Sequence, residues 1–469
     1  SGLLISRCVS DDHTSTVLMK TVLSPLLQAL TGGVPLWHQQ QQGATSTEDI
    51  SAATLSASTS LSTSASTSGS GSTSPTLLSN PNDDAVMYLA RCVQAVGFTT
   101  KTMPTSSLPF QIRDMYRCLL EASLRVLSTY PVHTHVRTQV IFLFHRMVAC
   151  LGEHLVQYLP STLPPLIQTT NAKNAVETFQ LVNQLLSKYR LDNQIHQIIH
   201  HLALPIITQL FRIMPNCTAR SSASQAPTDD QILSESLQRV FVLFLQNVVC
   251  NQLSMVFATA QALPYLSNIL TALLRACTNV PDPNVAKSTF IILRQLVEQW
   301  LLTTDKVDMA TANGNNGNNN NISNGDSGNR NGNMNCPEEA KRLLTGLLLN
   351  EGCQVMLSVL IRQGYDAGDA AMTLSMHKEV IQLQRTCVCS RMGVQYVDTF
   401  CTMLTSAHCN QEMMHQYRLF LTNLTLTRND GGQNRQNNNG GSRNQNHKAF
   451  RTFLAQLMKV LHERHHNNL

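Results

Sequence analysis

The C-terminal residues contain one run whose spacing matches a catalytic metal motif. His462, Glu463 and His466 form an H-E-x-x-H run, in which two histidines one helical turn apart bind zinc and the glutamate acts as a general base. Only three residues follow His466, so we expect no third zinc ligand downstream and a fraying helix end. The sequence therefore favours a solvated, histidine-rich terminus over a zinc hydrolase.

A second group of potential metal ligands consists of cysteines. Cys387 and Cys389 lie about twenty residues before His408 and Cys409, in segments rich in Leu, Met and Val. Their spacing matches none of the common zinc patterns. We therefore predict buried thiols on helix faces rather than a metal centre.

A third group lies at helical spacing. Asp192, His196 and His200 follow one another at intervals of four residues, so one helix would place them in a column that could bind a metal. An ordinary polar helix face has the same pattern, and it is the favoured interpretation. His145 and Arg146 have no nucleophile and base nearby, and no phosphate-binding loop or G-x-S-x-G run is present. We predict no catalytic residue, no metal and no cofactor, and hence a protein that is not an enzyme.

The composition favours helices packed on helices. The chain has 469 residues, 42% of them hydrophobic but only 5% aromatic. Single cores stop growing at roughly 250–300 residues, so an elongated array of helical repeats is the natural expectation. The 13 cysteines are odd in number and scattered, as expected of reduced thiols in an intracellular protein. The formal charge of +5 is mild, so any contact with RNA would need a local basic face.

Low-complexity segments interrupt the chain. They are rich in Gln, Ser and Thr or in Asn and Gly, and cannot bury enough apolar surface to offset the entropy of ordering. We predict disordered inserts at 39–82, 218–228, 311–336 and 428–446. We predict helices of the HEAT type at 1–38, 83–310 and 337–427, followed by a C-terminal helix at 447–469.

Between the inserts, apolar residues recur at helical spacing. One stripe begins at Leu237 and Val240, and another ends at Trp300, each with the i, i+3, i+4, i+7 pattern of an amphipathic helix. Proline precedes an apolar pair at Pro25, Pro205 and Pro264, which predicts recurring helix starts or bends. No apolar run reaches the roughly 18–20 residues needed to span a bilayer, so we expect no membrane insertion. The predicted fold class is an all-α superhelix of HEAT repeats.

Several of these helical segments resemble the C-terminal part of the exportin-T family, within the importin-β superfamily. Pro281–Trp300, with its Pro-Asp-Pro entry and terminal Trp, is similar to a helix of that family, and so is Val136–Pro160. Shorter matches, in the order of the family, begin at Leu89, Leu181 and Lys448.

The resemblance implies a nuclear export receptor without enzymatic activity. It would bind transfer RNA cooperatively with Ran-GTP, pass nuclear pore proteins as a monomer and shuttle between nucleus and cytoplasm. The main Ran contacts would lie in an N-terminal region absent from this sequence, and residue 1 is expected to fall inside a longer protein. The alternative is a HEAT-repeat karyopherin or scaffold that carries protein cargo.

The same resemblance directs attention to basic residues on the second helix of each pair, which would line the concave face. Arginine donates two parallel hydrogen bonds to phosphate, whereas lysine acts as a point charge. Taken singly, each of these helix residues fits a solvated helix face better than an RNA contact, so the prediction concerns them as a set. The basic C-terminal segment fits a solubilising loop beside a capping helix as well as it fits a phosphate contact. The candidates for contact with the transfer RNA backbone are Arg113, Arg117, Arg125, Arg212, Arg275, Lys341, Arg342, Lys448 and Arg451.

Overall fold

The structure is a computed structural model, and within the residues that it describes all regular secondary structure is helical, with no strand. The all-α, stacked-helix class predicted from the sequence is thereby confirmed. The chain forms two compact units, Ser1–Thr169 and Thr170–Leu469. The described residues are 17, 19–32, 81–100, 110–214, 228–302, 336–361, 370–406, 409, 411–429, 452, 453 and 456.

Several predictions concern residues outside that description. The H-E-x-x-H run, Lys448 and Arg451 lie there, as does nearly all of the predicted C-terminal helix at 447–469. So do almost all residues of the four predicted low-complexity inserts.

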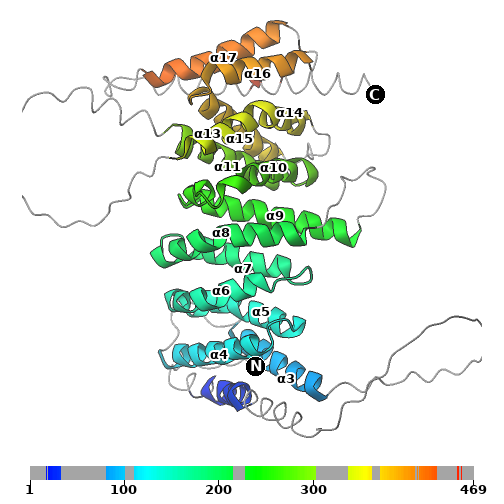
Figure 1. Cartoon of the computed structure of the whole chain (residues 1–469), viewed down its shortest axis with the longest axis vertical. Helices are drawn as coiled ribbons and strands as arrows, with labels where there is room; N and C mark the ends of the chain where they lie inside the picture. The colour runs from blue at the N-terminus through cyan, green and yellow to red at the C-terminus, as the bar shows by residue number, and fades with distance from the viewer. Residues whose placement is uncertain are drawn as a thin grey trace, which may run out of the picture. The chain divides into compact units, whose positions relative to one another are not determined.

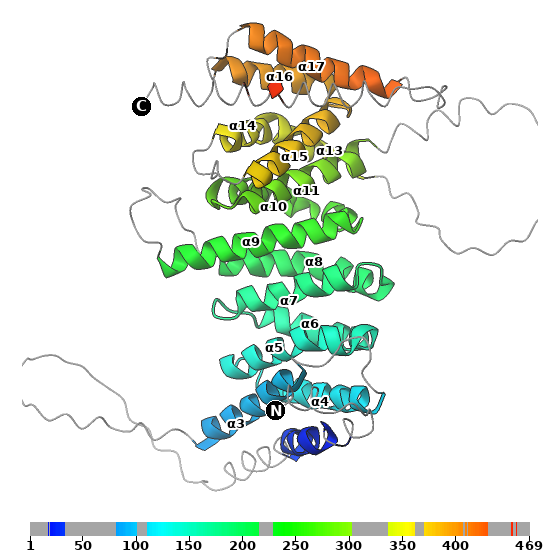
Figure 2. The ribbon, with the colours of Figure 1, turned by 180° about the vertical axis from the view of Figure 1, so that it is seen from behind.

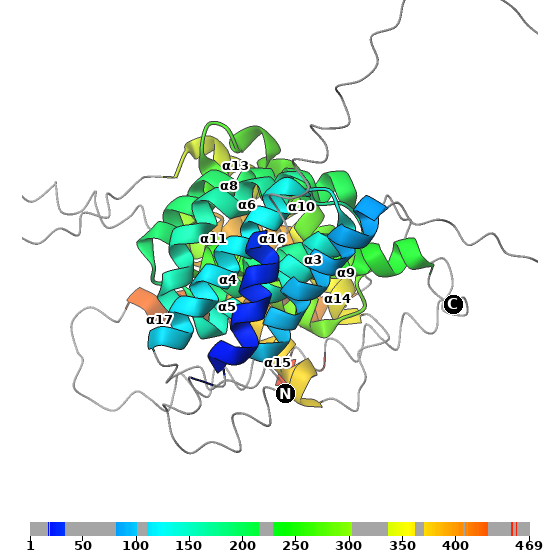
Figure 3. The same ribbon diagram turned by 90° about the horizontal axis from the view of Figure 1, so that it is seen from below.

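In the first unit, α3 packs against α5 and both contact α4. A further helix, covering 19–32, lies next to α4, to which Lys20 Nζ donates a hydrogen bond at Gln111 Oε1, 2.8 Å away (Figure 3). The approach of α3 to α5 is close because Gly97 has no side chain: a Cβ atom there would lie 2.5 Å from the Phe142 ring. The helices of this unit are α3 (Pro81–Thr99), α4 (Phe110–Thr129), α5 (Thr134–Cys150), η2 (Gly152–Tyr158) and α6 (Leu159–Gln168).

A buried arginine joins α5 to α6. The guanidinium of Arg137, 0% exposed, donates hydrogen bonds to the carbonyl of Leu166 at 2.9 Å, to the carbonyl of Pro131 at 3.2 Å and to Thr169 Oγ1. Leu166 lies in the last turn of α6, where carbonyl groups lack helical partners and carry partial negative charge. Burial lowers the pKa of Arg137 to about 10, so the side chain stays cationic at neutral pH. This charge therefore serves the fold and is not available to a ligand.

The second unit stacks its helices in two layers (Figures 1 and 2). The first layer consists of α7, α9, α11, α15 and α17, each in contact with the next. The second layer consists of α8, α10, the continuous run α13–η5–α14, and α16. The bounds are α7 (Ala175–Lys188), α8 (Asn193–Ile213), α9 (Asp229–Cys250), η3 (Ser254–Ala258), α10 (Leu263–Asn279), α11 (Pro283–Leu301), α13 (Glu338–Leu347), the π-helical η5 (Leu348–Gly352), α14 (Cys353–Ile361), α15 (Ala370–Val388), α16 (Gly393–Ser406) and α17 (Gln411–Asn429).

Local sequence explains where these helices begin. Thr228 caps α9 in a reciprocal pair with Gln231, and a side-chain oxygen of Asp282 accepts the backbone N–H of Asn284 at the start of α11. Pro264 occupies the first turn of α10, as predicted for a helix start. Pro205 instead lies inside α8, so at that position the proline does not mark a start.

The apolar stripes recognised in the sequence form the core. Leu237, Phe241 and Phe244 of α9 are buried, and so is Trp300 of α11, whose indole Nε1 donates to Ser254 Oγ at 2.9 Å. Burial on both α9 and α11 confirms the predicted amphipathic helices. The Trp300 contact ties the end of the first-layer helix α11 to η3.

One helix of the described part, α9, is long and apolar enough to cross a membrane by length and composition alone. This differs from the expectation that no segment would reach that length. Half of the relevant window is buried inside the protein, and α9 packs between α7 and α11. Its apolar character is therefore accounted for by packing within the first layer.

A buried polar side chain in α15 gives a test of the packing. Gln384 is 0% exposed, and neither amide atom has a hydrogen-bond partner among the residues that the structure describes. Leaving such a group unsatisfied costs about 1–3 kcal/mol, whereas an apolar replacement of similar shape removes that cost. We predict that Gln384→Met raises the free energy of unfolding, measured by denaturant titration. Gln382→Met, at a half-buried position of the same helix, is the control; a fall in stability confined to Gln384→Met would show that the amide is satisfied in solution.

Candidate nucleic-acid interface

Seven of the nine basic candidates lie in the described residues, on four helices. Three are on α4 of the first unit, and the others are on α8, α10 and α13, which all belong to the second layer of the second unit. Their burial differs widely, from the buried Lys341 through the half-buried Arg113 to five exposed positions. The seven are Arg113, Arg117, Arg125, Arg212, Arg275, Lys341 and Arg342.

The α4 stripe carries mixed charge. Arg117 forms an ion pair with Asp114, one turn earlier, at 2.8 Å. Glu121, between the two C-terminal arginines of the stripe, accepts a hydrogen bond from the Tyr158 hydroxyl at 2.7 Å. Burial and this carboxylate both raise the pKa of Tyr158, so the hydroxyl stays protonated as the donor. Arg125 is the α4 arginine whose side chain is exposed and forms no ion pair with the described residues.

Lys341 is placed differently from the prediction. It is only 5% exposed, and its Nζ atom lies 2.8 Å from Glu338 Oε1, one turn earlier in α13. Glu338 also pairs with Arg391 at 3.2 Å, and the hydrogen bond from Lys341 is the main reason that the pKa of this carboxyl is lowered. A buried, paired ammonium cannot reach an RNA phosphate. Lys341 is therefore not among the proposed contacts.

Three arginines of the second layer are exposed and uncommitted. The side chains of Arg212, Arg275 and Arg342 form no ion pair or hydrogen bond within the described part of the chain. They lie near the C-terminal ends of α8 and α10 and near the N-terminal end of α13. Each keeps its full fork of donors for a planar or tetrahedral anion.

In the first layer, by contrast, polar side chains form hydrogen bonds from one helix to the next. Asn183 Nδ2 of α7 donates to the carbonyl of Val240 in α9 at 3.1 Å, and Asn247 Nδ2 donates to Asn183 Oδ1 at 3.3 Å. Asn251 continues the series with a bond to the carbonyl of Leu186 at 3.3 Å. These amides fix α7 against α9.

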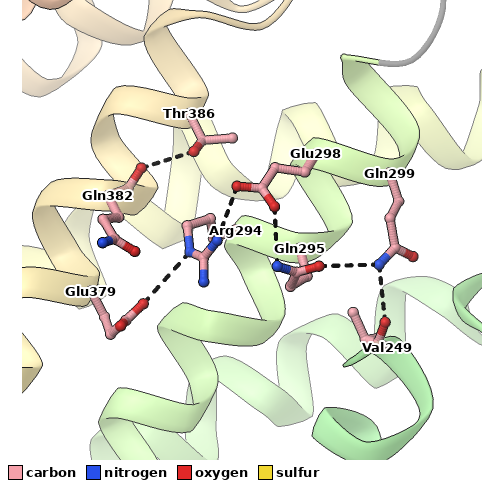
Figure 4. Close-up of polar contacts among 8 residues, drawn as sticks. All are labelled: Val249, Arg294, Gln295, Glu298, Gln299, Glu379, Gln382 and Thr386. Carbon is pink, nitrogen blue, oxygen red and sulfur yellow. Dashed lines mark hydrogen bonds and ion pairs between the residues drawn. The ribbon is translucent and has the colours of Figure 1, made fainter. Parts of the chain in front are cut away.

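Charged side chains extend this network to α11 and α15 (Figure 4). Gln299 Nε2 of α11 donates to the carbonyl of Val249 at 2.9 Å. Arg294, also on α11, pairs with Glu298 at 3.0 Å and with Glu379 of α15 at 3.5 Å. Arg239 on α9 is likewise paired, with Glu235 and Asp282. These first-layer arginines are neutralised, whereas Lys287 of α11 and Lys378 of α15 form no ion pair within the described part of the chain.

The potential metal ligands have structural roles. Asp192 caps α8 by accepting the backbone N–H of Gln194 at 2.8 Å, and His196 Nε2 lies 2.8 Å from the carbonyl oxygen of Arg190. Cys387 is buried, as predicted, and burial raises the pKa of its thiol well above the usual range. No group of three metal-ligating side chains occurs among the residues that the structure describes.

Two residues that are not among the nine basic candidates lie close to Arg275. Phe211 and Gln238 line the same cavity as Arg275, although they lie on α8 and α9. Both fall within amphipathic helices, so no sequence signal separates them from ordinary packing positions. Only the tertiary contact of three helices brings them together.

The stacked helices of the two units define this chain as a helical-repeat protein. The sequence model of the Exportin-T family matches residues 77–430, about three quarters of the chain. The chain therefore belongs to the Exportin-T family.

Individual members of the family support this assignment. Exportin-T of Homo sapiens is 27% identical over 218 residues, 45% of this chain and 22% of that protein. Exportin-T of Danio rerio is 24% identical over 226 residues, 47% of this chain and 23% of its own. Exportin-T of Arabidopsis thaliana is 29% identical over 204 residues, 44% of this chain and 20% of its own. The matched segments thus span less than a quarter of each relative.

Proposed function

We propose that this chain is part of a nuclear export receptor that binds transfer RNA cooperatively with Ran-GTP and carries it through the nuclear pore to the cytoplasm. The match of residues 77–430 to the Exportin-T family is the observation that supports it. The receptor would act as a monomer that shuttles between the two compartments. It would perform no chemistry itself, since binding coupled to a conformational equilibrium is sufficient for directed transport.

Within this chain, the proposed contacts to RNA phosphates are Arg125, Arg212, Arg275 and Arg342. Their exposure, and the lack of an acidic partner among the described residues, support this choice over the paired arginines Arg239 and Arg294 of the first layer. Recognition through phosphates and sugars follows shape rather than base sequence, which suits a cargo pool that shares an outline. The main contacts to Ran would lie in the preceding region of the receptor.

The test uses a full-length receptor containing this chain, titrated with fluorescently labelled transfer RNA with and without GTP-loaded Ran. We predict that Ran-GTP raises the RNA affinity roughly 5- to 150-fold, the usual range of coupling between two sites. An affinity that is the same in both titrations would overturn the proposal. GDP-loaded Ran is the matched control, since it differs only in the nucleotide.

A carrier of protein cargo is distinguished by a separate experiment. Partners captured with GTP-loaded Ran are compared before and after ribonuclease treatment. RNA cargo is lost after digestion, whereas a protein that remains bound would identify the chain as a scaffold for protein cargo.

A further inference from the structure

A cavity of about 350 Å³ lies in the second unit, where the C-terminal end of α8 meets α9 and α10. This volume is within the range of small-ligand sites in proteins. Arg275 is among its lining residues, which include no Asp or Glu. The cavity therefore combines a cation with walls that do not repel an anion.

One wall is aromatic. Phe211 of α8 and Phe241 of α9 have ring centroids 5.5 Å apart with an angle of 56° between the rings. Phe241 is buried, while Phe211 is half-buried and lines the cavity. A flat, partly apolar group is the natural occupant of such a wall.

The side-chain amide of Gln238 calls for a hydrogen-bond donor on the ligand. Gln238 Nε2 donates to Ser234 Oγ at 3.1 Å, and the buried Oε1 atom of Gln238 accepts no hydrogen bond from the residues that the structure describes. That oxygen can be satisfied only by an N–H or O–H donor. Asn268 and Asn279 of α10 also line the cavity, and each amide side chain can both donate and accept.

We propose that this cavity binds one unpaired nucleotide of an RNA strand. The base lies against Phe211, an N–H of its edge donates to Gln238 Oε1, and the phosphate binds Arg275. Arg212, which directly follows Phe211 in α8, meets an adjacent phosphate of the same strand. A nucleotide combines a planar ring, an N–H donor edge and a phosphate in one unit, which matches Phe211, Gln238 and Arg275 together; a carboxylate-bearing peptide is an alternative outcome of the test. The inference rests on the proposed RNA-binding function and adds to it a site for an unstacked base.

The experiment uses the full-length receptor with GTP-loaded Ran and two RNA probes: a short single-stranded oligonucleotide and a blunt, fully paired duplex. Gln238→Met removes the acceptor and Phe211→Leu removes the ring. Each is expected to weaken oligonucleotide binding roughly 5- to 150-fold, the usual effect of losing one base–aromatic or base-edge contact, and to leave duplex binding unchanged. Gln246→Met, a half-buried amide of α9 outside the cavity, is the matched control.

The outcomes separate this inference from the function on which it rests. If the unmodified receptor binds neither probe, the RNA-binding proposal fails and the pocket proposal fails with it. If it binds both and the two variants bind the oligonucleotide normally, only the pocket proposal fails. Displacement of the oligonucleotide by equimolar mononucleotide would identify a free-nucleotide site, and displacement by an acidic peptide would identify a peptide site; either result overturns the proposal. Equal unfolding temperatures for the variants and the unmodified receptor establish that both are folded.

Discussion

Replacing Arg212, Arg275 and Arg342 together with glutamate is expected to lower the affinity of the full-length receptor for transfer RNA at least about 100-fold. Each uncommitted guanidinium can form a charge-assisted hydrogen bond to phosphate, and such bonds contribute about 1.5–3 kcal/mol each. Glutamate in their place adds repulsion. The three side chains have no ion pair in the described residues, so their loss leaves no buried partner unsatisfied.

The salt dependence should change as well. Each phosphate contact contributes about 0.9 to the slope of log affinity against log salt concentration, so the triple variant should lower the magnitude of that slope by about 3. Binding is measured by fluorescence anisotropy at several salt concentrations, with GTP-loaded Ran present.

A matched control is available on the first layer of the same unit. Lys287→Glu combined with Lys378→Glu reverses two cations on α11 and α15 that form no ion pair with described residues. This double variant should reduce affinity only slightly, through long-range charge. If it weakens RNA binding as strongly as the triple variant, the specific assignment to the second layer is wrong.

Sequence periodicity was sufficient to predict the helical class and most of the core. The apolar stripe that ends at Trp300 is buried as expected, and the Pro-Asp-Pro entry places Asp282 as the cap of α11. These features depend on residues within one or two turns of each other. Local spacing therefore contains the information that fixes them.

Local spacing did not predict which of the basic residues are exposed. Lys341 and Arg342 are neighbours in sequence, yet the first is buried against Glu338 and the second is exposed. Successive residues of a helix point about 100° apart. If the buried face is assigned one position too early or too late, the buried residue and the exposed residue are therefore interchanged. The pairing of Lys341 with Glu338, three residues earlier, was the available local signal.

The cavity beside Arg275 could not be predicted from spacing. Phe211, Gln238 and Arg275 lie on three helices, and each occupies an unremarkable place in its own amphipathic pattern. Their convergence depends on how the end of α8 meets α10 through the packing of a whole layer. A site of this kind requires tertiary structure to be seen.

The second large effect is expected at Trp300 of α11. The residue is 0% exposed, and truncating a fully buried Trp to Ala costs about 3–5 kcal/mol because apolar contacts are lost and a cavity remains. We predict that Trp300→Ala lowers the free energy of unfolding of the second unit by this amount, measured by denaturant titration with circular dichroism. The loss is a large fraction of the stability of a typical domain, about 5–15 kcal/mol.

Two further variants show how much of this loss in the free energy of unfolding comes from packing and how much from the hydrogen bond. Trp300→Phe keeps much of the buried area but loses the indole N–H, which donates to Ser254 Oγ at 2.9 Å. Ser254→Ala keeps the indole and leaves that N–H buried without its acceptor, at a cost of about 1–3 kcal/mol. If packing dominates, both variants are less destabilised than Trp300→Ala. If Ser254→Ala is as destabilising as Trp300→Ala, the hydrogen bond from α11 to η3 stabilises this layer more than the volume of the Trp300 side chain does, which would contradict the prediction.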